Sequence, residues 1–446
     1  MQKEEPQENP ENAQVASDGF MPPTVVYKFR WLVLLGLFLL SFGNGITWIT
    51  FSTISNITRD YYGVTLMWVN SLSLVFMITY IPLAFVGSWV LDRKGLEYGL
   101  FFGAGCTILG VWIRMASVGG TFAWALIGQI VCSIGQPFIL SASPKLAANW
   151  FADEQRALAT TIASVGNPLG VAIGFIIPTA VVSVPNDIPL LLLVEALIVT
   201  VCSYPTFILI WENPPTPAST SSSLEREESF SKSLKTIAKD VNMWILFIEF
   251  GFGLGAFNTL ATLVNNLMEP YGYTNDQSSA VGACVVVLGL VGSGVAGVIL
   301  DKTKRYKLVL LTCLALATGS MLLFTFMLKE DNMGMLIFTA CILGFSTTPV
   351  IPVSFETSAE MTFPLGEATP TSFLLVSGQI TGIGFVIWMQ SLIDNGHIRQ
   401  ANLITVVCLA VSTLVTCFLR VKTKRLNYDQ RTKLLNEAGE NDSHDY

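Results

Sequence analysis

Twelve apolar stretches divide this chain, and each is near the length of about 20 residues that a helix needs to cross a bilayer. Because lipid offers no hydrogen-bond partners, a crossing segment must satisfy its own backbone groups, and a helix does so. Charged residues make up only 13% of the 446 residues, against about 25% in a soluble domain. The sequence therefore predicts an all-α integral membrane protein. The expected spans are 31–56, 67–91, 98–116, 121–143, 158–183, 188–211, 243–267, 278–300, 306–328, 332–355, 368–393 and 401–420.

One long polar segment, residues 212–240, interrupts the apolar pattern. Pro214, Pro215 and Pro217 lead into a Ser-rich run of mixed charge, a composition that buries too little apolar surface to order itself. We expect a cytoplasmic linker whose distal part forms a short surface helix. The predicted domains are a disordered cytoplasmic tail (1–27), a six-helix bundle (28–211), this linker, a second six-helix bundle (241–420) and a second cytoplasmic tail (421–446).

The two halves carry an internal repeat. Asp92 follows the second span, Asp301 follows the eighth, and cations come directly after both. A second repeated motif contains Phe151 in the first half and Phe363 in the second, at nearly the same separation along the chain. Two parallel six-helix halves joined by a linker are the plan of the major facilitator fold, with twelve helices in two pseudo-symmetric bundles.

Lysine and arginine set the expected orientation. If both termini are cytoplasmic, all but four of the 25 basic residues lie on that side, the exceptions being Arg59, Arg114, Lys329 and Arg399. The positive-inside rule therefore predicts cytoplasmic termini. The tail before Tyr27 lacks a cleavable signal-peptide pattern, so the first span is expected to direct insertion. The sequence contains no basic nucleic-acid surface, and no nucleic-acid partner is expected.

A polar stripe runs along the first span. Asn44, Trp48, Ser52 and Ser55 stand at i, i+4, i+8 and i+11, which places them on one helical face. Such a face must meet protein or a water-filled cavity, so we expect this helix to line a central path for a small polar solute. Close helix packing through glycines is the alternative. Similar stripes occur in the fourth, seventh and eleventh spans: Gln129, Cys132, Gln136 and Ser143; Gly251, Gly255, Asn258, Thr262 and Asn265; Ser372, Gln379, Gly382 and Gln390.

The loop after the second span, Leu91-Asp92-Arg93-Lys94-Gly95, resembles the signature loop of the major facilitator superfamily. The match is incomplete, because the usual second basic pair after the glycine is absent. The resemblance implies a cytoplasmic gate in which Asp92 pairs with Arg156, Arg93 takes part, and Asp301 holds the mirrored position. A plain topology signal with solvated charges is the alternative.

A narrower resemblance covers roughly residues 30–425. Its blocks are similar to solute carrier family 49, the family of the feline leukaemia virus subgroup C receptors. Within that family, the chain is most similar to the branch called major facilitator superfamily domain-containing protein seven. The resemblance implies transport by alternating access. The family blocks are residues 48–56, 62–65, 68–73, 141–151, 166–170 and 377–379, and the branch blocks are 143–147, 167–170 and 211–217.

The resemblance also implies a binding site. Choline-transporting members of the family build theirs from a helix 1 tryptophan, glutamines in helices 4 and 11, and a helix 7 tyrosine. The matching positions here are Trp48, Gln136 and Gln379, whereas Asn258 stands where the tyrosine would be. An indole face attracts a quaternary ammonium through cation–π interaction.

The missing tyrosine leaves the substrate open. Phe51 or Phe257 supplies the second aromatic wall, or the substrate is a more polar amine or another small metabolite. A choline-like amine is the first expectation, moved by facilitated diffusion.

Two acidic residues lie inside predicted spans, Glu195 in the sixth and Glu249 in the seventh. An ionisable group at membrane depth is a functional candidate by default, so either is a candidate for proton coupling, with cavity lining or packing as the alternative. Both histidines lie outside the spans, which excludes a histidine relay. Lys145 and Glu356, near the cytoplasmic ends of the fourth and tenth spans, are expected to form an ion pair between the halves, with interfacial snorkelling as the alternative.

Other functions are weaker readings of the sequence. A membrane-embedded enzyme needs a catalytic constellation, and no His, paired Asp or Cys/His group occurs inside the predicted spans. No metal or other cofactor is expected. A receptor or sensor on a transporter scaffold remains an alternative. We expect a monomer in the bilayer of the plasma membrane, with an endolysosomal membrane as the second possibility.

Overall fold

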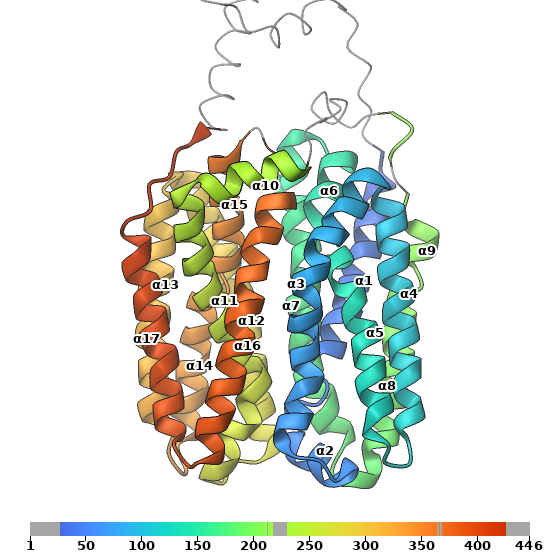
Figure 1. Cartoon of the computed structure of the whole chain (residues 1–446), viewed down its shortest axis with the longest axis vertical. Helices are drawn as coiled ribbons and strands as arrows, with labels where there is room; N and C mark the ends of the chain where they lie inside the picture. The colour runs from blue at the N-terminus through green and yellow to red at the C-terminus, as the bar shows by residue number, and fades with distance from the viewer. Residues whose placement is uncertain (1–26, 212, 217–229, 364, 366–367, 425–446) are drawn as a thin grey trace, which may run out of the picture.

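The computed structural model describes residues 27–211, 213–216, 230–363, 365 and 368–424. Twelve of its helical segments are long and apolar enough to cross a membrane, which confirms the twelve predicted spans. The described ends of the chain lie at the same end of the molecule, and the short helix α2 lies at the opposite end (Figure 1).

The first half of the chain forms one bundle (Figure 1). Its helices are α1 (Arg30–Ile49), α2 (Ser55–Tyr62), α3 (Leu66–Arg93), α4 (Leu96–Arg114), α5 (Phe122–Leu140), α6 (Ala142–Trp150), α7 (Asp153–Val181), α8 (Ile188–Ser203) and α9 (Thr206–Leu209).

The second half forms the neighbouring bundle. Helix α10 is the surface helix expected in the distal part of the polar segment, and it lies across the end where the described part of the chain begins and ends (Figure 1). The helices are α10 (Phe230–Lys239), α11 (Val241–Met268), α12 (Asn275–Thr303), α13 (Tyr306–Met327), α14 (Met333–Thr347), α15 (Val350–Thr362), α16 (Ala368–Asp394) and α17 (Ile398–Thr416).

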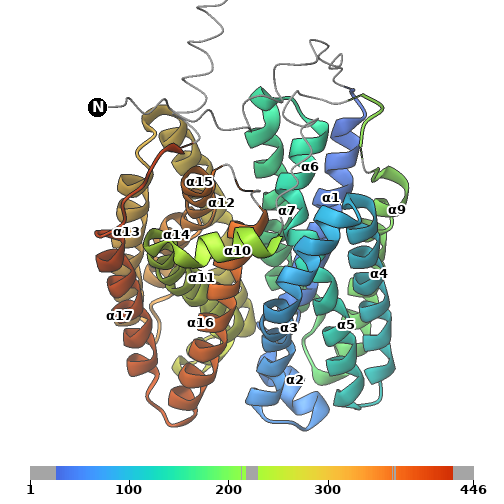
Figure 2. The same ribbon diagram turned by 45° about the horizontal axis from the view of Figure 1, so that its top comes forward.

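Two helix pairs make most of the contact between the halves: α3 packs on α16, and α7 packs on α12. Figure 2 shows the two bundles side by side from a second direction. Within the first bundle α1 packs closely on α7, because Gly45 and Gly170 let the two backbones approach. A Cβ atom at Gly45 would collide with the Asn167 carbonyl oxygen, and one at Gly170 with that of Phe42. Small residues permit such contacts between membrane helices, so the packing alternative for the glycines of the first span is also realised.

Four spans expected to be continuous are interrupted. The first ends at Ile49, and α2 begins only at Ser55, which corrects the prediction of one helix over 31–56. The fourth breaks at Ser141 between α5 and α6, the sixth breaks after Ser203 between α8 and α9, and the tenth breaks before Val350. Proline has no N–H to donate and its ring clashes with the preceding turn, which accounts for the last break at Pro349.

Candidate solute-binding site

A central cavity of about 140 Å³ lies where the two bundles meet. Residues from both halves line it, so the cavity exists only because the bundles face each other. No charged residue is among the described residues that line it. They are Ser41, Trp48, Phe76, Gln136, Leu140, Ser143, Ser164, Asn167, Pro168, Val171, Leu254, Phe257, Asn258, Ile351, Phe355, Leu375 and Gln379.

Four residues singled out from the sequence meet in this cavity: Trp48, Gln136, Asn258 and Gln379. Asn258 Nδ2 donates a hydrogen bond of 3.4 Å to Gln379 Oε1, so α11 and α16 present a joined pair of amides. Trp48 is 7% exposed, and its buried indole N–H has no partner among the described residues. A buried donor without a partner costs free energy, which a solute acceptor in the cavity would remove.

Aromatic rings supply much of the remaining wall. Phe76 comes from α3, Phe257 from α11 and Phe355 from α15. Phe257 was one of two residues expected to replace the missing tyrosine, and the structure brings it to the cavity.

Phe51, the other, lies elsewhere, which corrects its placement. It is 2% exposed in a separate apolar cluster, with the Arg114 guanidinium carbon 5.9 Å from its ring centroid. Asn44 is also outside the cavity lining. Its amide donates to Thr107 Oγ1 at 3.3 Å and to the Cys132 carbonyl at 3.5 Å, so it ties α1 to α4 and α5. Helical periodicity identified a polar face, but it does not show whether that face contacts other helices or a water-filled cavity.

A fully buried ion pair lies inside the first bundle. Arg114 Nη2 is 2.9 Å from Glu195 Oε2, and both side chains are 0% exposed. Thr50 Oγ1 donates to the same carboxylate oxygen at 2.8 Å, and Arg114 Nη1 donates to Gln129 Oε1 at 3.1 Å. Arg114 was counted among the basic residues of the outer side, but its side chain is buried inside the bundle. Two opposite charges within apolar runs of one half were the signal that would have predicted the pair.

Glu249 of the second bundle is 0% exposed and has a different environment. Its Oε2 accepts a hydrogen bond of 3.2 Å from Ser354, and Oε1 has no partner in the part of the chain that the structure describes. Neither Glu195 nor Glu249 lines the central cavity. A coupling role for either would therefore act through neighbouring helices.

Neutral side chains join the halves at the α2 end of the molecule, and we call them the closure network: Ser52, Ser55, Asn56, Asn70, Asn265, Asn266, Asn275 and Gln390. Ser55 Oγ donates to Asn266 Oδ1 at 2.6 Å, and Asn265 Nδ2 donates to Ser55 Oγ at 3.1 Å. The amides of Asn266 and Asn70 both donate to Gln390 Oε1 at 2.8 Å.

The closure network corrects part of the expected cavity lining. Ser52 donates to the Thr262 carbonyl at 3.1 Å, and Ser55, Asn265 and Gln390 bond across the interface. Of the stripe in the first span, only Trp48 lines the cavity. Asn44 bonds to α4 and α5 within its own bundle. Ser52 and Ser55 bond across the interface, because the chain leaves the helical geometry of α1 after Ile49.

The expected gate lies at the opposite end, where the described part of the chain begins and ends (Figure 1). Lys145 Nζ donates to the Leu91 carbonyl oxygen, and Arg93 is exposed. The side chains of Asp92, Arg156 and Asp301 are outside the described residues. The gate built on them, and the pairing of Lys145 with Glu356, remain predictions.

Two helical bundles around a central cavity of solute size define a multi-pass membrane transporter. The sequence model of the Major Facilitator Superfamily matches residues 33–386. The chain belongs to that superfamily and, within it, to solute carrier family 49, as its motifs predicted.

Named relatives match most of the chain. The choline/ethanolamine transporter flvcr2a of Danio rerio is 32% identical over 442 residues, covering 96% of this chain and 93% of the relative. The choline/ethanolamine transporter FLVCR1 of Felis catus is 33% identical over 425 residues, covering 91% and 75%. FLVCR2 of Homo sapiens, also named a choline/ethanolamine transporter, is 30% identical, covering 91% and 80%.

Solved structures share the fold at low sequence identity. A bacterial homolog of the human lysosomal transporter Spinster, in an inward-facing and occupied conformation, superposes with a TM-score of 0.67 at 13% identity, covering 89% of this chain and 97% of that one. The E. coli fucose:proton symporter FucP superposes with a TM-score of 0.63 at 16% identity, covering 88% and 98%. Both confirm the predicted all-α major facilitator fold.

Proposed function

We propose that this protein carries choline or a closely related small amine, such as ethanolamine, across its membrane by alternating access. The observation that carries the proposal is the meeting of Trp48, Gln136 and Gln379 in one cavity. The relatives that match most of the chain are named choline/ethanolamine transporters. Because these relatives are named as transporters, we propose that this protein also is a transporter and not an enzyme.

The size and chemistry of the cavity support a small cation. Its volume of about 140 Å³ is close to the roughly 150 Å³ that holds one benzene molecule in a protein core. The faces of Trp48, Phe257 and Phe355 offer cation–π attraction, which contributes about 0.5 to 2 kcal/mol per contact. Two glutamines and the free indole N–H offer partners for a hydroxyl or amino group, which needs them once it leaves water.

The closure network supports alternating access. It joins the halves at one end through neutral hydrogen bonds, each of which contributes only about 0.5 to 1.5 kcal/mol. Bonds of this strength stabilise a closed end and still break in a transport cycle. With the termini placed in the cytoplasm, the closed end is the outer one, and the cavity would exchange solute with the cytoplasm.

We place the protein in the plasma membrane as a monomer, with an endolysosomal membrane as the alternative address. Facilitated diffusion is the proposed mode of transport, because no carboxyl group is among the described residues of the cavity wall. No cofactor takes part in this proposal, and its partners are the solute and the lipid.

The test is uptake of radiolabelled choline by cells that display equal amounts of wild type, Trp48→Ala and Trp89→Ala. Trp89 is 46% exposed on α3, outside the cavity, and serves as the matched control. We expect saturable uptake by wild type and Trp89→Ala, competition by ethanolamine, and loss of about tenfold or more in Trp48→Ala, as removal of a desolvated cation–π contact predicts. Uptake by wild type no greater than that of empty-vector cells would contradict the proposal.

Proton coupling through Glu249 is the second candidate. Its partner Ser354 lies on α15, which also carries Ile351 and Phe355 of the cavity wall. A change of protonation at Glu249 would therefore act on a helix that touches the solute. An imposed pH gradient that accelerates uptake in wild type but not in Glu249→Gln would favour this candidate, and equal uptake with and without the gradient would exclude it.

A further inference from the structure

The ring of Phe257 separates the central cavity from two smaller voids. Phe257 is the only residue shared by the wall of the cavity and the walls of both voids, among the described residues that line these three spaces. Each void measures about 10 Å³, which is about the space that one water molecule needs. The ring therefore has solute space on one side and unfilled space behind it.

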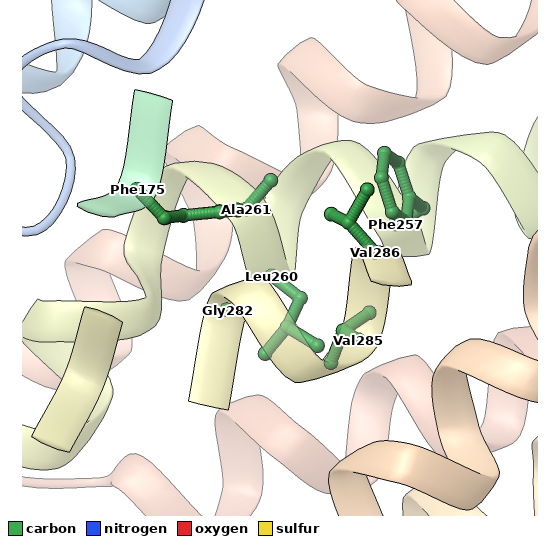
Figure 3. Close-up of a pocket in the computed structure, with 7 residues that line it drawn as sticks. All are labelled: Phe175, Phe257, Leu260, Ala261, Gly282, Val285 and Val286. Atoms are coloured by element: carbon green, nitrogen blue, oxygen red, sulfur yellow. The ribbon is translucent and has the colours of Figure 1, made fainter. Parts of the chain in front are cut away.

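The first void lies between the two halves of the protein. Figure 3 shows Leu260 and Ala261 of α11 with Val285 and Val286 of α12, and Phe175 of α7 on the side away from Phe257. All these side chains are apolar, and an apolar void of this kind stays dry. A ring that shifts partly into it displaces no water.

The second void lies inside the C-terminal bundle. Ala256 and Leu260 of α11, Met321 of α13 and Leu343 of α14 are among its walls. Protein interiors are packed with few voids, so two voids against one aromatic ring leave that ring less constrained than its neighbours.

The other aromatic walls of the cavity are held more firmly. The Phe355 ring stacks on Phe250, with centroids 5.4 Å apart. Phe76 is only 1% exposed. The turn that carries Trp48 is held by Ser73, whose hydroxyl donates to the Trp48 carbonyl at 3.3 Å.

We propose that Phe257 is the movable wall that sets the largest solute the carrier accepts. This inference rests on the proposed function and deepens it: quaternary ammonium ions larger than choline bind by displacing the Phe257 ring into the voids behind it. Ions of choline size fit without that displacement. The voids thus determine the upper size limit, although no solute atom enters them.

The test fills one void from behind without altering the cavity. Val286→Leu adds a methylene to the first void, where Val286 is 1% exposed. Its matched control is Val287→Leu, which adds the same group to the next residue of α12, 44% exposed. Binding of tetramethylammonium and tetraethylammonium to the purified full-length proteins is measured by thermal stabilisation, which does not depend on transport.

We expect Val286→Leu to lose about tenfold in affinity for tetraethylammonium, as overpacking behind the Phe257 ring predicts, with less than about a twofold change for tetramethylammonium. Val287→Leu should match wild type with both ions. Phe257→Ala, which joins the three spaces, should bind tetraethylammonium more tightly than wild type does, and it keeps the test valid if Val286→Leu does not fold.

Two results would overturn the inference, and they differ. In the first, tetramethylammonium stabilises every variant, and tetraethylammonium binds Val286→Leu with the same affinity as wild type. If Val286→Leu does not fold, the same comparison is made with Phe257→Ala. This result would show that the movable wall is wrong and that the proposed site stands. In the second, neither ion stabilises wild type or Phe257→Ala. The proposed substrate class would then be wrong, and a size limit for quaternary ammonium ions would have no meaning.

Discussion

Among the described residues, each half of the molecule buries one glutamate completely, but the surroundings of the two glutamates differ. In the first half, Glu195 pairs with Arg114 at 2.9 Å and also accepts a hydrogen bond from Thr50. In the second half, Glu249 accepts one hydrogen bond from Ser354, and its other oxygen has no partner among the described residues. The pseudo-symmetry of the fold does not extend to its buried charges.

The difference assigns different roles to the halves. Breaking a buried ion pair leaves an uncompensated charge, so the pair holds the turn after α1, which follows Trp48, in a single arrangement. The carboxyl group of Glu249 is held by one hydroxyl, and such a hydrogen bond contributes only about 0.5 to 1.5 kcal/mol. We infer that the first half presents the tryptophan on a rigid frame, whereas the second half contains the parts that move, α15 and the Phe257 ring.

Neutralising Glu195 should have the largest effect. Glu195→Gln leaves Arg114 charged and buried, and removing one partner of such a pair costs about 3 to 5 kcal/mol. The free energy of unfolding, measured on purified protein in detergent, should fall by this amount. A loss below about 1 kcal/mol would mean that water or another group compensates Arg114, and the contrast between the halves would fail.

Removing both charges should restore most of that loss. Replacing a buried pair by apolar residues of similar volume is often neutral or stabilising. The double variant Arg114→Met, Glu195→Leu should therefore have a free energy of unfolding within about 2 kcal/mol of that of wild type. Failure to recover relative to Glu195→Gln would show that the hydrogen bonds to Thr50 and Gln129, rather than charge balance, stabilise the first half.

Cutting the closure network should have an intermediate effect on the contact between the halves. Asn266→Ala removes bonds to Ser55, Asn70 and Gln390, which weakens the closed end by about 1 to 3 kcal/mol. The measurement uses Val171→Cys, a cysteine in the cavity wall, in a protein whose native cysteines are replaced. In Asn266→Ala this cysteine should react about tenfold faster or more than in the protein without that change, when an impermeant thiol reagent is added at the α2 end. Asn395→Ala, an exposed change at the same end, should leave the rate unchanged. Equal rates in all three proteins would remove the network from the gate.

The smallest effect is expected from Glu249→Gln, the same chemical change made in the second half. The glutamine carbonyl can still accept the bond from Ser354, so the free energy of unfolding should change by about 1 kcal/mol or less. A loss as large as that of Glu195→Gln would show that Glu249 has a charged partner, and the two halves would then be alike.

Much of the site was predicted from the sequence. Trp48, Gln136, Asn258 and Gln379 were placed by family motifs, and all four meet in one cavity. Predictions from helical periodicity were less successful. Asn44 faces other helices of its own bundle, because a polar stripe looks the same whether it meets water or a hydrogen-bonding neighbour.

Charges inside apolar runs were recognised singly but not as a pair. Arg114 lies near the end of the third predicted span, 98–116, where a basic residue is compatible with the outer membrane surface. Only the packing of α4 against α8 brings it to Glu195. Separation along the chain carries no information on such a contact, which depends on how two helices rotate against each other.

The sequence by itself determined the class of this protein: a chain with twelve apolar runs and few charges must cross the membrane as helices, because lipid cannot satisfy an open backbone. It also determined which half carries the tryptophan and which carries the asparagine in place of tyrosine. Only the tertiary structure decided which polar faces line the cavity, which close one end, and which buried acid is neutralised by a cation. Those outcomes depend on contacts of a few ångströms between helices far apart in the chain, and local periodicity does not specify them.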